Sequence, residues 1–239
     1  MNLVSQYYAA FAAAYVRGQA LRGAANPVEG TPKLLQALLN TPLEQLTETQ
    51  TEGILLAGEA AGLKLYHFKS GSRELPRIKK VLGILRSFPF QTLLDVGSGR
   101  GVFLWRCLGE LPEIKVTSVD LLAERVAFMQ AVTLGGLERL KAVQADFCVY
   151  NGPPVDVVTL LEVLEHIPDV QAAVRTAVKL AQKYVVVSVP SKPDNNPEHI
   201  HLLTREKLTA LFASAGCARL HFDGVNGHLL MIATMEAHT

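Results

Sequence analysis

Three glycines occupy alternate positions just after a short apolar run. The segment reads Leu93-Leu94-Asp95-Val96-Gly97-Ser98-Gly99-Arg100-Gly101, and a helical pattern begins near Val102. Glycine lets a backbone turn tightly and approach a ligand without interference from a Cβ atom, and a helix N-terminus supplies unpaired N–H donors. The segment predicts a ligand-binding turn between a strand and a helix.

Acidic residues close the next two strand-like runs. Asp120 lies 25 positions after Asp95, at the end of IKVTSVD, and Asp146 with Phe147 ends RLKAVQADF. In an open α/β sheet, a carboxylate at the position of Asp120 accepts the hydroxyls of an adenosine ribose. Asp146 offers an acceptor for an adenine amino group, and Phe147 an apolar wall beside it. Each acid alone could be a helix cap or a loop acid, but together they predict an adenosine-containing ligand.

Two classes of cofactor compete for this turn. A dinucleotide favours G-x-G-x-x-G, with its pyrophosphate on the helix N-terminus. This chain has G-S-G-R-G instead, with Asp95 two residues before the first glycine. A carboxylate there repels a pyrophosphate but suits the cationic amino-acid end of S-adenosylmethionine, which carries no phosphate.

A second acidic segment follows the fourth strand-like run. It reads Glu162-Val163-Leu164-Glu165-His166-Ile167-Pro168-Asp169, and Glu198-His199-Ile200-His201 comes after the fifth run. His166 could be a general base or could stabilise its loop. Alternatively, Glu162, Glu165 and His166 could bind Mg²⁺, Mn²⁺ or Fe²⁺ together with a later histidine. We expect packing or solvent contacts for the histidines that have no partner pattern, which are His67, His221, His228 and His238.

The elements that must position these residues change in character near residue 87. Before it the patterns are helical, over Leu3 to Val16, Glu48 to Phe68 and Leu75 to Phe88, with Thr31-Pro32 and Thr41-Pro42 as helix starts. After it, seven strand-like runs alternate with amphipathic segments, which is typical of βαβ units around a mostly parallel sheet. Only residues 223–227 separate the last two runs, so we expect an antiparallel hairpin there.

Composition limits the possible functions. The chain has 239 residues, 49% of them hydrophobic, and a formal net charge of +1, which is too balanced for a protein that binds polyanions over its whole surface. Charged residues interrupt every apolar run before it could span a bilayer, and the N-terminus lacks the basic region of a signal peptide. The three widely spaced cysteines favour buried thiols. We therefore expect a cytoplasmic globular protein.

At these residues the chain resembles the class I S-adenosylmethionine-dependent methyltransferases. The resemblance covers about residues 88–239 and depends on LLDVGSGRG, SVD, ADF and VDVVTLLEVLEHIPD in that order. It implies an α/β, Rossmann-like, seven-stranded and mostly parallel sheet with an antiparallel last strand. This methyltransferase domain, residues 88–239, would follow a helical N-terminal extension or lid, residues 1–87. One departure is the AQK loop before YVVVSVP, which lacks a glycine pair that many relatives have.

The resemblance also implies site roles. Asp95, Gly97 and Gly99 would hold the methionine end of the cofactor, Asp120 the ribose, and Asp146 with Phe147 the adenine. The full set of expected cofactor contacts is Asp95, Gly97, Ser98, Gly99, Gly101, Asp120, Leu121, Asp146, Phe147 and Glu162. His166 and Glu165 are the expected catalytic residues, and we favour an acid–base role without a metal.

The expected reaction is methyl transfer to an oxygen, carbon or nitrogen atom of a small molecule. The Glu-His segment also looks like that of the small-RNA 3′-terminal ribose 2′-O-methyltransferases, in which two glutamates and two histidines hold a divalent metal. RNA could then contact the basic stretch of residues 64–86, which carries seven basic residues against one acid. A third hypothesis is a non-catalytic, cofactor-binding interaction protein.

Overall fold

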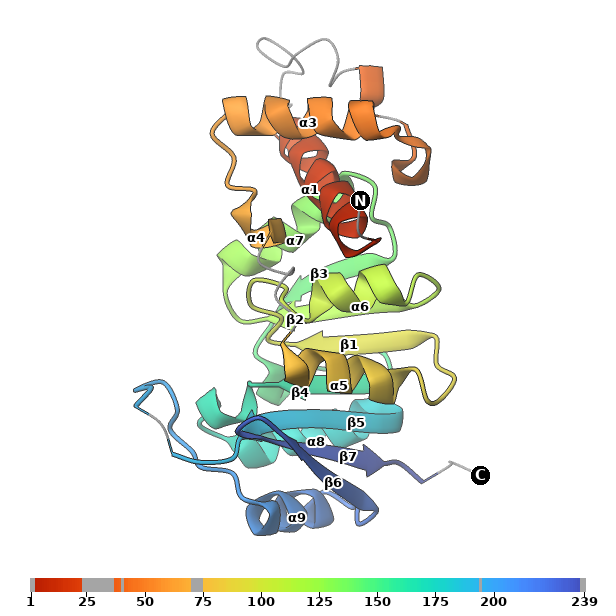
Figure 1. Ribbon diagram of the computed structural model, residues 1–239. Helices are drawn as coiled ribbons and strands as arrows, with labels where there is room; N and C mark the ends of the chain where they lie inside the picture. The colour runs from red at the N-terminus through yellow and green to blue at the C-terminus, as the bar shows by residue number, and fades with distance from the viewer. Residues whose placement is uncertain (1–2, 23–36, 40, 70–74, 194, 237–239) are drawn as a thin grey trace. The chain divides into compact units, whose positions relative to one another are not determined.

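The computed structural model describes residues 3–22, 37–39, 41–69, 75–193 and 195–236 (Figure 1). The elements, in chain order, are α1 (Leu3–Arg22), η1 (Leu43–Gln45), α3 (Glu48–Ala60), α4 (Tyr66–Lys69), α5 (Pro76–Leu85), β1 (Thr92–Val96), α6 (Leu104–Glu110), β2 (Lys115–Asp120), α7 (Ala123–Leu134), β3 (Leu140–Gln144), η3 (Phe147–Val149), β4 (Val155–Leu161), η4 (Leu164–His166), α8 (Val170–Leu180), β5 (Ala181–Pro190), α9 (Arg205–Ser214), β6 (Leu220–Val225) and β7 (His228–Thr234). The helix start predicted at Thr31-Pro32 lies outside the described residues.

The chain forms two compact units. Unit 1 combines residues 1–73, 98–112 and 122–142, and unit 2 combines residues 74–97, 113–121 and 143–239. The boundary predicted after residue 87 falls between α5 and β1, and both of these elements belong to unit 2. The division into an extension of residues 1–87 and a domain of residues 88–239 therefore stays a prediction, because the compact units combine segments from both parts.

The seven strands form one sheet in the order β3-β2-β1-β4-β5-β7-β6. Strand β1 pairs in parallel with β2 and β4, and β4 pairs in parallel with β5. Strand β7 is antiparallel to both of its neighbours, β5 and β6. The sheet order reverses between β1 and β4, where open α/β sheets bind ligands beyond the carboxyl ends of their strands. The predicted seven-stranded, mostly parallel sheet with an antiparallel last strand is confirmed.

Alternate residues of the central strands build the main core of unit 2. Leu94, Val158 and Val185 lie side by side in the register of β1, β4 and β5, and all three are buried in one cluster with α8 and α9. These strands read as continuous apolar runs because helices cover them. Figure 1 shows α5 in front of these strands and α8 behind them.

The hairpin between β6 and β7 is tighter than the sequence indicated. Strand β6 extends to Val225, so the connection is only Asn226-Gly227 rather than residues 223–227. Both turn residues have positive φ, 41° and 85°. Asn-Gly with this geometry matches a type I′ turn, whose twist suits a two-residue hairpin. The turn sets His228 at the start of β7, opposite Pro190 at the end of β5.

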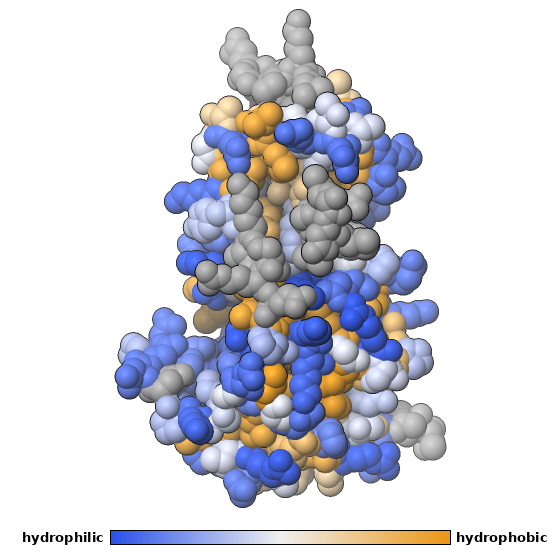
Figure 2. Space-filling model, in the orientation of Figure 1, coloured by the Kyte–Doolittle hydropathy of each residue, from blue (hydrophilic) through white to orange (hydrophobic). Residues whose placement is uncertain are grey.

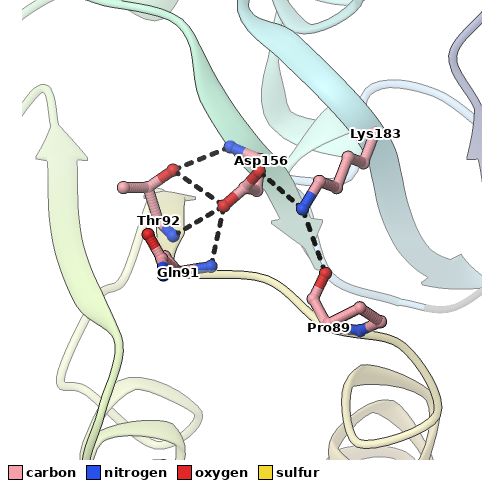
Figure 3. A network of polar contacts seen from close by, with 5 residues as sticks. All are labelled: Pro89, Gln91, Thr92, Asp156 and Lys183. Carbon is pink, nitrogen blue, oxygen red and sulfur yellow. Dashed lines mark hydrogen bonds and ion pairs between the residues drawn. The ribbon is translucent and has the colours of Figure 1, made fainter. Parts of the chain in front are cut away.

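A partly buried carboxylate, that of Asp156, joins the segments at the amino edge of the sheet (Figure 3). Asp156 Oδ2 accepts hydrogen bonds from the backbone N–H groups of Gln91 and Thr92, at 2.7 and 3.1 Å. Its Oδ1 lies 3.0 Å from Lys183 Nζ, which also donates to the carbonyl of Pro89. Burial of Asp156 raises its pKa, but these hydrogen bonds and the Lys183 charge outweigh burial and hold the pKa below the usual range.

Unit 1 is built on close packing of α1 against α7. A Cβ atom added at Gly18 would lie 1.7 Å from the Ala131 carbonyl oxygen, and one added at Gly135 would lie 1.7 Å from that of Ala14. The backbones therefore approach closely at two glycines, one within α1 and one directly after α7, where a larger residue would clash. No described helix is long and apolar enough to cross a bilayer.

The helical pattern predicted over Glu48 to Phe68 is divided into α3 and α4. Gly62, with φ of 77°, donates its N–H to the Glu59 carbonyl, and Leu63 donates to the carbonyl of Gly58. These bonds satisfy the last carbonyls of α3 and stop the helix. The helix predicted after Thr41-Pro42 is shorter than expected, being the single 3₁₀ turn η1.

Candidate functional site

The glycine turn has the backbone that its sequence predicted. Gly97, Gly99 and Gly101 have φ values of 64°, 57° and 81°, which residues with a Cβ atom rarely adopt. The Gly97 N–H donates to the carbonyl of Val119 at 2.8 Å. A Cβ atom at Gly97 would lie 2.8 Å from Cγ2 of Val163, so a residue with a side chain would clash at this position. Gly97 belongs to unit 2, and the turn continues into unit 1 from Ser98.

Asp95 is held inside β1 just before the turn. Its side chain is buried, and its Oδ1 accepts a hydrogen bond of 2.7 Å from the hydroxyl of Thr159 on the neighbouring strand β4. A fixed carboxylate two residues before the first glycine places negative charge at the carboxyl end of β1. This position is compatible with a cationic ligand group and unfavourable for a pyrophosphate.

A backbone hydrogen bond joins the carboxyl ends of β2 and β3, next to Asp120 and Asp146. The N–H of Ala145 donates to the Asp120 carbonyl at 3.2 Å. Asp120 is 5% exposed, whereas the adjacent Leu121 is 65% exposed, an unusual exposure for leucine beside a buried acid. Asp146 accepts the Cys148 N–H at 2.9 Å, so it also caps η3. Leu121 therefore presents an exposed apolar side chain directly after Asp120, the acid predicted to bind the ribose.

Phe147 does not present its ring as an open wall. The ring is 5% exposed and belongs to the main core of unit 2. Its contact with an adenine stays a prediction. Burial, followed by the charge of Asp146, raises the pKa of the neighbouring Cys148 thiol, which keeps it protonated at neutral pH.

Glu162, directly after β4, adopts a positive φ of 58°. Its Oε1 accepts a 2.6 Å hydrogen bond from the Ser188 hydroxyl, and its Oε2 lies 3.1 Å from Nε2 of His228. The Glu162 N–H donates to the Ser188 carbonyl at 2.9 Å. Nδ1 of the same imidazole lies 3.1 Å from the Asn226 carbonyl. The expectation that His228 makes only packing or solvent contacts is wrong, because its ring lies between Glu162 and Asn226.

Glu165, His166 and His199 form a second group at this edge. One ligand atom from each lies within 4.8 Å of the others, and the two imidazole rings are 4.8 Å apart in an edge-to-face arrangement. His166 Nδ1 lies 2.9 Å from the Glu198 carbonyl. A carbonyl only accepts hydrogen bonds, so Nδ1 carries the proton and Nε2 keeps a lone pair for a proton or a metal.

The predicted set of metal ligands is thus only partly brought together. Glu162 is held by Ser188 and His228, and His201 Nε2 donates to the Ile167 carbonyl at 3.1 Å. The sequence spacing could not separate these roles, since it gives no angle for a residue after a strand. One available signal for His228 was Asn226-Gly227, because a two-residue turn fixes which residue starts the returning strand.

The loop that carries His199 and His201 connects β5 to α9. It projects at the left of Figure 1, and Figure 2 shows mostly hydrophilic side chains over it. The N–H groups of Ile200 and His201 both donate to the Glu165 carbonyl, at 2.9 and 3.3 Å. The loop is therefore fastened to the Glu-His segment by backbone bonds and ends at Thr204, the predicted N-cap of α9.

The residues of the basic stretch are divided between the two units. Lys64 belongs to unit 1, whereas Arg77, Lys79, Lys80 and Arg86 belong to unit 2. Lys80 Nζ lies 2.6 Å from the Asp223 carboxylate and donates to the Gly224 carbonyl at 3.2 Å. Lys80, one of the basic residues of this stretch, therefore already forms an ion pair with Asp223 of β6.

Unit 1 carries a cluster of aromatic rings on α1, α4, α6 and α7. Its members are Phe11, Tyr15, Tyr66, His67, Phe68, Trp105 and Phe128. Tyr66, 52% exposed, lies 4.0 Å from the ring of His67, which meets the edge of Phe128 at 5.7 Å. Burial, then the charges of Arg100 and Lys64, lowers the pKa of His67. Part of this cluster is open to solvent beside the Arg100 of the glycine turn.

The chain matches one protein family over more than half of its length. The model of a family described as "Methyltransferase domain" matches residues 68–221. No curated protein matches the chain.

Solved structures give the same fold at low identity. An O-methyltransferase family protein from Burkholderia thailandensis is 18% identical, with a TM-score of 0.58, and the match covers 95% of this chain and 72% of that one. A Nostoc punctiforme protein, provisionally called an O-methyltransferase, is 15% identical, with a TM-score of 0.56 and coverage of 71% and 59%. This chain thus spans less than two thirds of the Nostoc protein. The N-terminal domain of EvdMO1, solved with S-adenosylhomocysteine (SAH) bound, is 16% identical, with a TM-score of 0.53 and coverage of 70% and 82%.

Proposed function

We propose that this chain, which belongs to the class I S-adenosylmethionine-dependent methyltransferases, transfers the methyl group to a small-molecule acceptor. The observation that carries the proposal is His166, whose ring leaves Nε2 with a lone pair at the carboxyl edge of the sheet. The cytoplasmic location stays a prediction.

The residues present fit the cofactor. Asp95 supplies a buried carboxylate for the cationic methionine end, and Gly97 gives a backbone with no Cβ atom beside it. Asp120 supplies the acceptor for the ribose hydroxyls, and the exposed Leu121 an apolar face for the adenine. When bound, S-adenosylmethionine supplies an activated methyl group on a sulfonium centre.

The chain itself has to align the acceptor and remove its proton. Alignment of the two reactants supplies most of the rate of such a displacement. His166 Nε2 takes the proton from an O–H or N–H acceptor, while Nδ1 holds the ring in place through the Glu198 carbonyl. A positioned base of this kind contributes about 10²- to 10⁴-fold. Glu165 is buried beside His166 and favours the imidazolium that forms.

Two features support a small acceptor over RNA. Tyr66 lies against the ring of His67 in unit 1 and is 52% exposed, and this apolar side chain offers a contact for a small acceptor. The lysines and arginines of residues 64–86 lie in two units, and Lys80 is paired with Asp223. Phosphate contacts to RNA use lysine and arginine side chains, and the ion pair with Asp223 already occupies Lys80.

A second candidate is metal-dependent methylation of an RNA 3′-terminal ribose. Its supporting observation is the convergence of Glu165, His166 and His199, a donor set that suits Mn²⁺ or Fe²⁺. Such a metal would be held by these three side chains and would engage the two terminal hydroxyls. Titration of the purified chain with Mn²⁺, followed by electron paramagnetic resonance, tests this set without any activity. Binding that is lost in H199A would support the second candidate.

One experiment distinguishes the two candidates and the non-catalytic alternative. The protein is incubated with methyl-labelled cofactor and, in parallel, with a metabolite extract or an RNA extract, and the products are analysed by mass spectrometry. We expect label in a small molecule, with full activity in EDTA. Label in RNA that disappears in EDTA would favour the second candidate. Cofactor binding with no labelled product in either extract would contradict both.

A further inference from the structure

Both non-glycine residues with positive φ in the described part of the chain contact the same imidazole. They are Glu162, at 58°, and Asn226, at 41°. Nε2 of His228 lies 3.1 Å from Oε2 of Glu162, and Nδ1 lies 3.1 Å from the Asn226 carbonyl. The type I′ turn accounts for the backbone of Asn226, whereas Glu162 must be held in its conformation by its surroundings, and such held positions gather at functional sites.

The proton positions on this ring follow from its partners. The Asn226 carbonyl only accepts, so Nδ1 must donate to it. Nε2 is the ring nitrogen that faces the Glu162 carboxylate, 3.1 Å from its Oε2. The Ser188 hydroxyl donates to the other carboxylate oxygen at 2.6 Å. Both oxygens of Glu162 are therefore held, one from β5 and one from β7.

The backbone conformation of Glu162 affects the glycine turn through the next residue, Val163. Val163 follows Glu162 directly, and its Cγ2 fills the space that a Cβ atom at Gly97 would need, at 2.8 Å. Val163 also accepts the N–H of His166 through its carbonyl, at 3.0 Å. The backbone direction at residue 162 thus fixes one wall of the glycine turn and the start of the segment that carries His166.

We propose that His228, with Ser188, is a positioning residue that holds Glu162 in its left-handed backbone and thereby sets Val163 against Gly97 for cofactor binding. The proposal rests on the proposed methyltransferase function. In it, the Glu162 carboxylate acts through the backbone and has no required contact with the cofactor. His228 and Glu162 are 23% and 22% exposed, so substitution there leaves the core of unit 2 in place.

Glycine at residue 162 makes the test specific. Glycine adopts a φ near +58° without strain, whereas alanine does not. If the carboxylate serves only to hold the backbone, E162G should bind SAH at least fivefold more tightly than E162A, in isothermal titration calorimetry. If the carboxylate touches the cofactor, both variants should be equally weak, and the proposal would be overturned.

Substitution of His228 gives a second test of the proposal. We expect H228L to bind SAH about tenfold more weakly than the wild type and H228Q, which keeps a donor for Glu162, to lie within about threefold of it. The loss in H228L should disappear when the leucine is combined with E162G, because the glycine needs no hold. H221L is the matched control, a histidine on β6 of the same hairpin, and it should bind as the wild type does.

The possible failures are distinguishable. A wild-type chain that binds no SAH would contradict the proposed function itself. Wild-type binding together with unchanged binding by H228L would overturn only the role of His228. If H228L fails to fold, as judged by thermal unfolding, the E162G and E162A pair still decides.

Discussion

The two edges of the sheet in unit 2 use carboxylates in opposite ways. At the amino edge, Asp156 binds backbone N–H groups of Gln91 and Thr92 and the ammonium of Lys183, all in ordinary extended backbone. At the carboxyl edge, Glu162 lies in an unusual backbone conformation and is held by the side chains of Ser188 and His228. Stability is thus concentrated at one edge, and the strained backbone at the edge where the ligand is expected. Substitutions at the two edges should therefore affect different measurements.

The largest expected effect is on rate, at the carboxyl edge. H166A should lower turnover by about 10²- to 10⁴-fold, because the acceptor loses its base, while SAH affinity stays within about threefold of the wild type. Single-turnover kinetics with saturating cofactor and calorimetry measure the two quantities. H221A is the control. If H166A lowered SAH affinity and rate together, His166 would be part of the cofactor site instead.

The next effect is on stability, at the amino edge. D156A should lower the free energy of unfolding by about 1.5–3 kcal/mol in urea titrations, since it removes the charged acceptor of the Gln91 and Thr92 N–H groups and the partner of Lys183. SAH affinity should not change. A weaker affinity in D156A would mean that the two edges are not separable.

The same residue predicts a pH dependence. Because the pKa of Asp156 is lowered in the folded chain, its stabilisation is present above the ordinary carboxyl value near ~3.9 and is lost as pH falls through the folded value. The stability difference between the wild type and D156N should be constant above about pH 5 and should shrink in more acidic solution. A difference that grew on acidification would contradict the assignment.

A smaller effect is expected on affinity. D120A should weaken SAH binding by about 1.5–3 kcal/mol, through loss of charge-assisted hydrogen bonds to the ribose. Its urea midpoint should move much less than that of D156A. An unchanged affinity would show that the carboxyl end of β2 does not bind the ribose.

The smallest effect concerns the support of Asp95. T159V removes the 2.7 Å hydrogen bond to the Asp95 carboxylate but keeps the side-chain shape, so we expect a loss of about 1 kcal/mol in the free energy of unfolding. T159S keeps the hydroxyl and should recover most of this loss. An equal loss in both variants would assign the effect to packing.

Local patterns predicted much of the fold because they reflect local physics. The runs around Val158 and Val185 are continuously apolar since helices cover both faces of those strands, and the short interval of residues 223–227 predicted an antiparallel pair. The end of α3 at Gly62 was also readable, although the pattern was extended past it. The acids at the strand ends were predicted for the same reason, since each follows its own strand.

The rest of the site depends on contacts between distant parts of the chain. Nothing near Glu162 indicates that its partner is His228, because the pairing exists only once β5 and β7 lie side by side. Phe147 was predicted as a wall from its neighbour Asp146, but its ring fills the core, since an aromatic ring gains more from burial. The contacts of Glu165 with His166 and His199 likewise required the folded loop after β5.

The strand order has a consequence for the sequence of folding events. The β6–β7 pair is joined by two residues, and such a hairpin can form in about 1–10 μs. The β1–β4 pair instead joins residues such as Leu94 and Thr159, which are 65 positions apart, and closing so long a loop is slow. Val163 can meet Gly97 only after that slow step. A chain that is still folding can therefore present a finished hairpin, with His228 in place, well before it has a turn able to receive a cofactor.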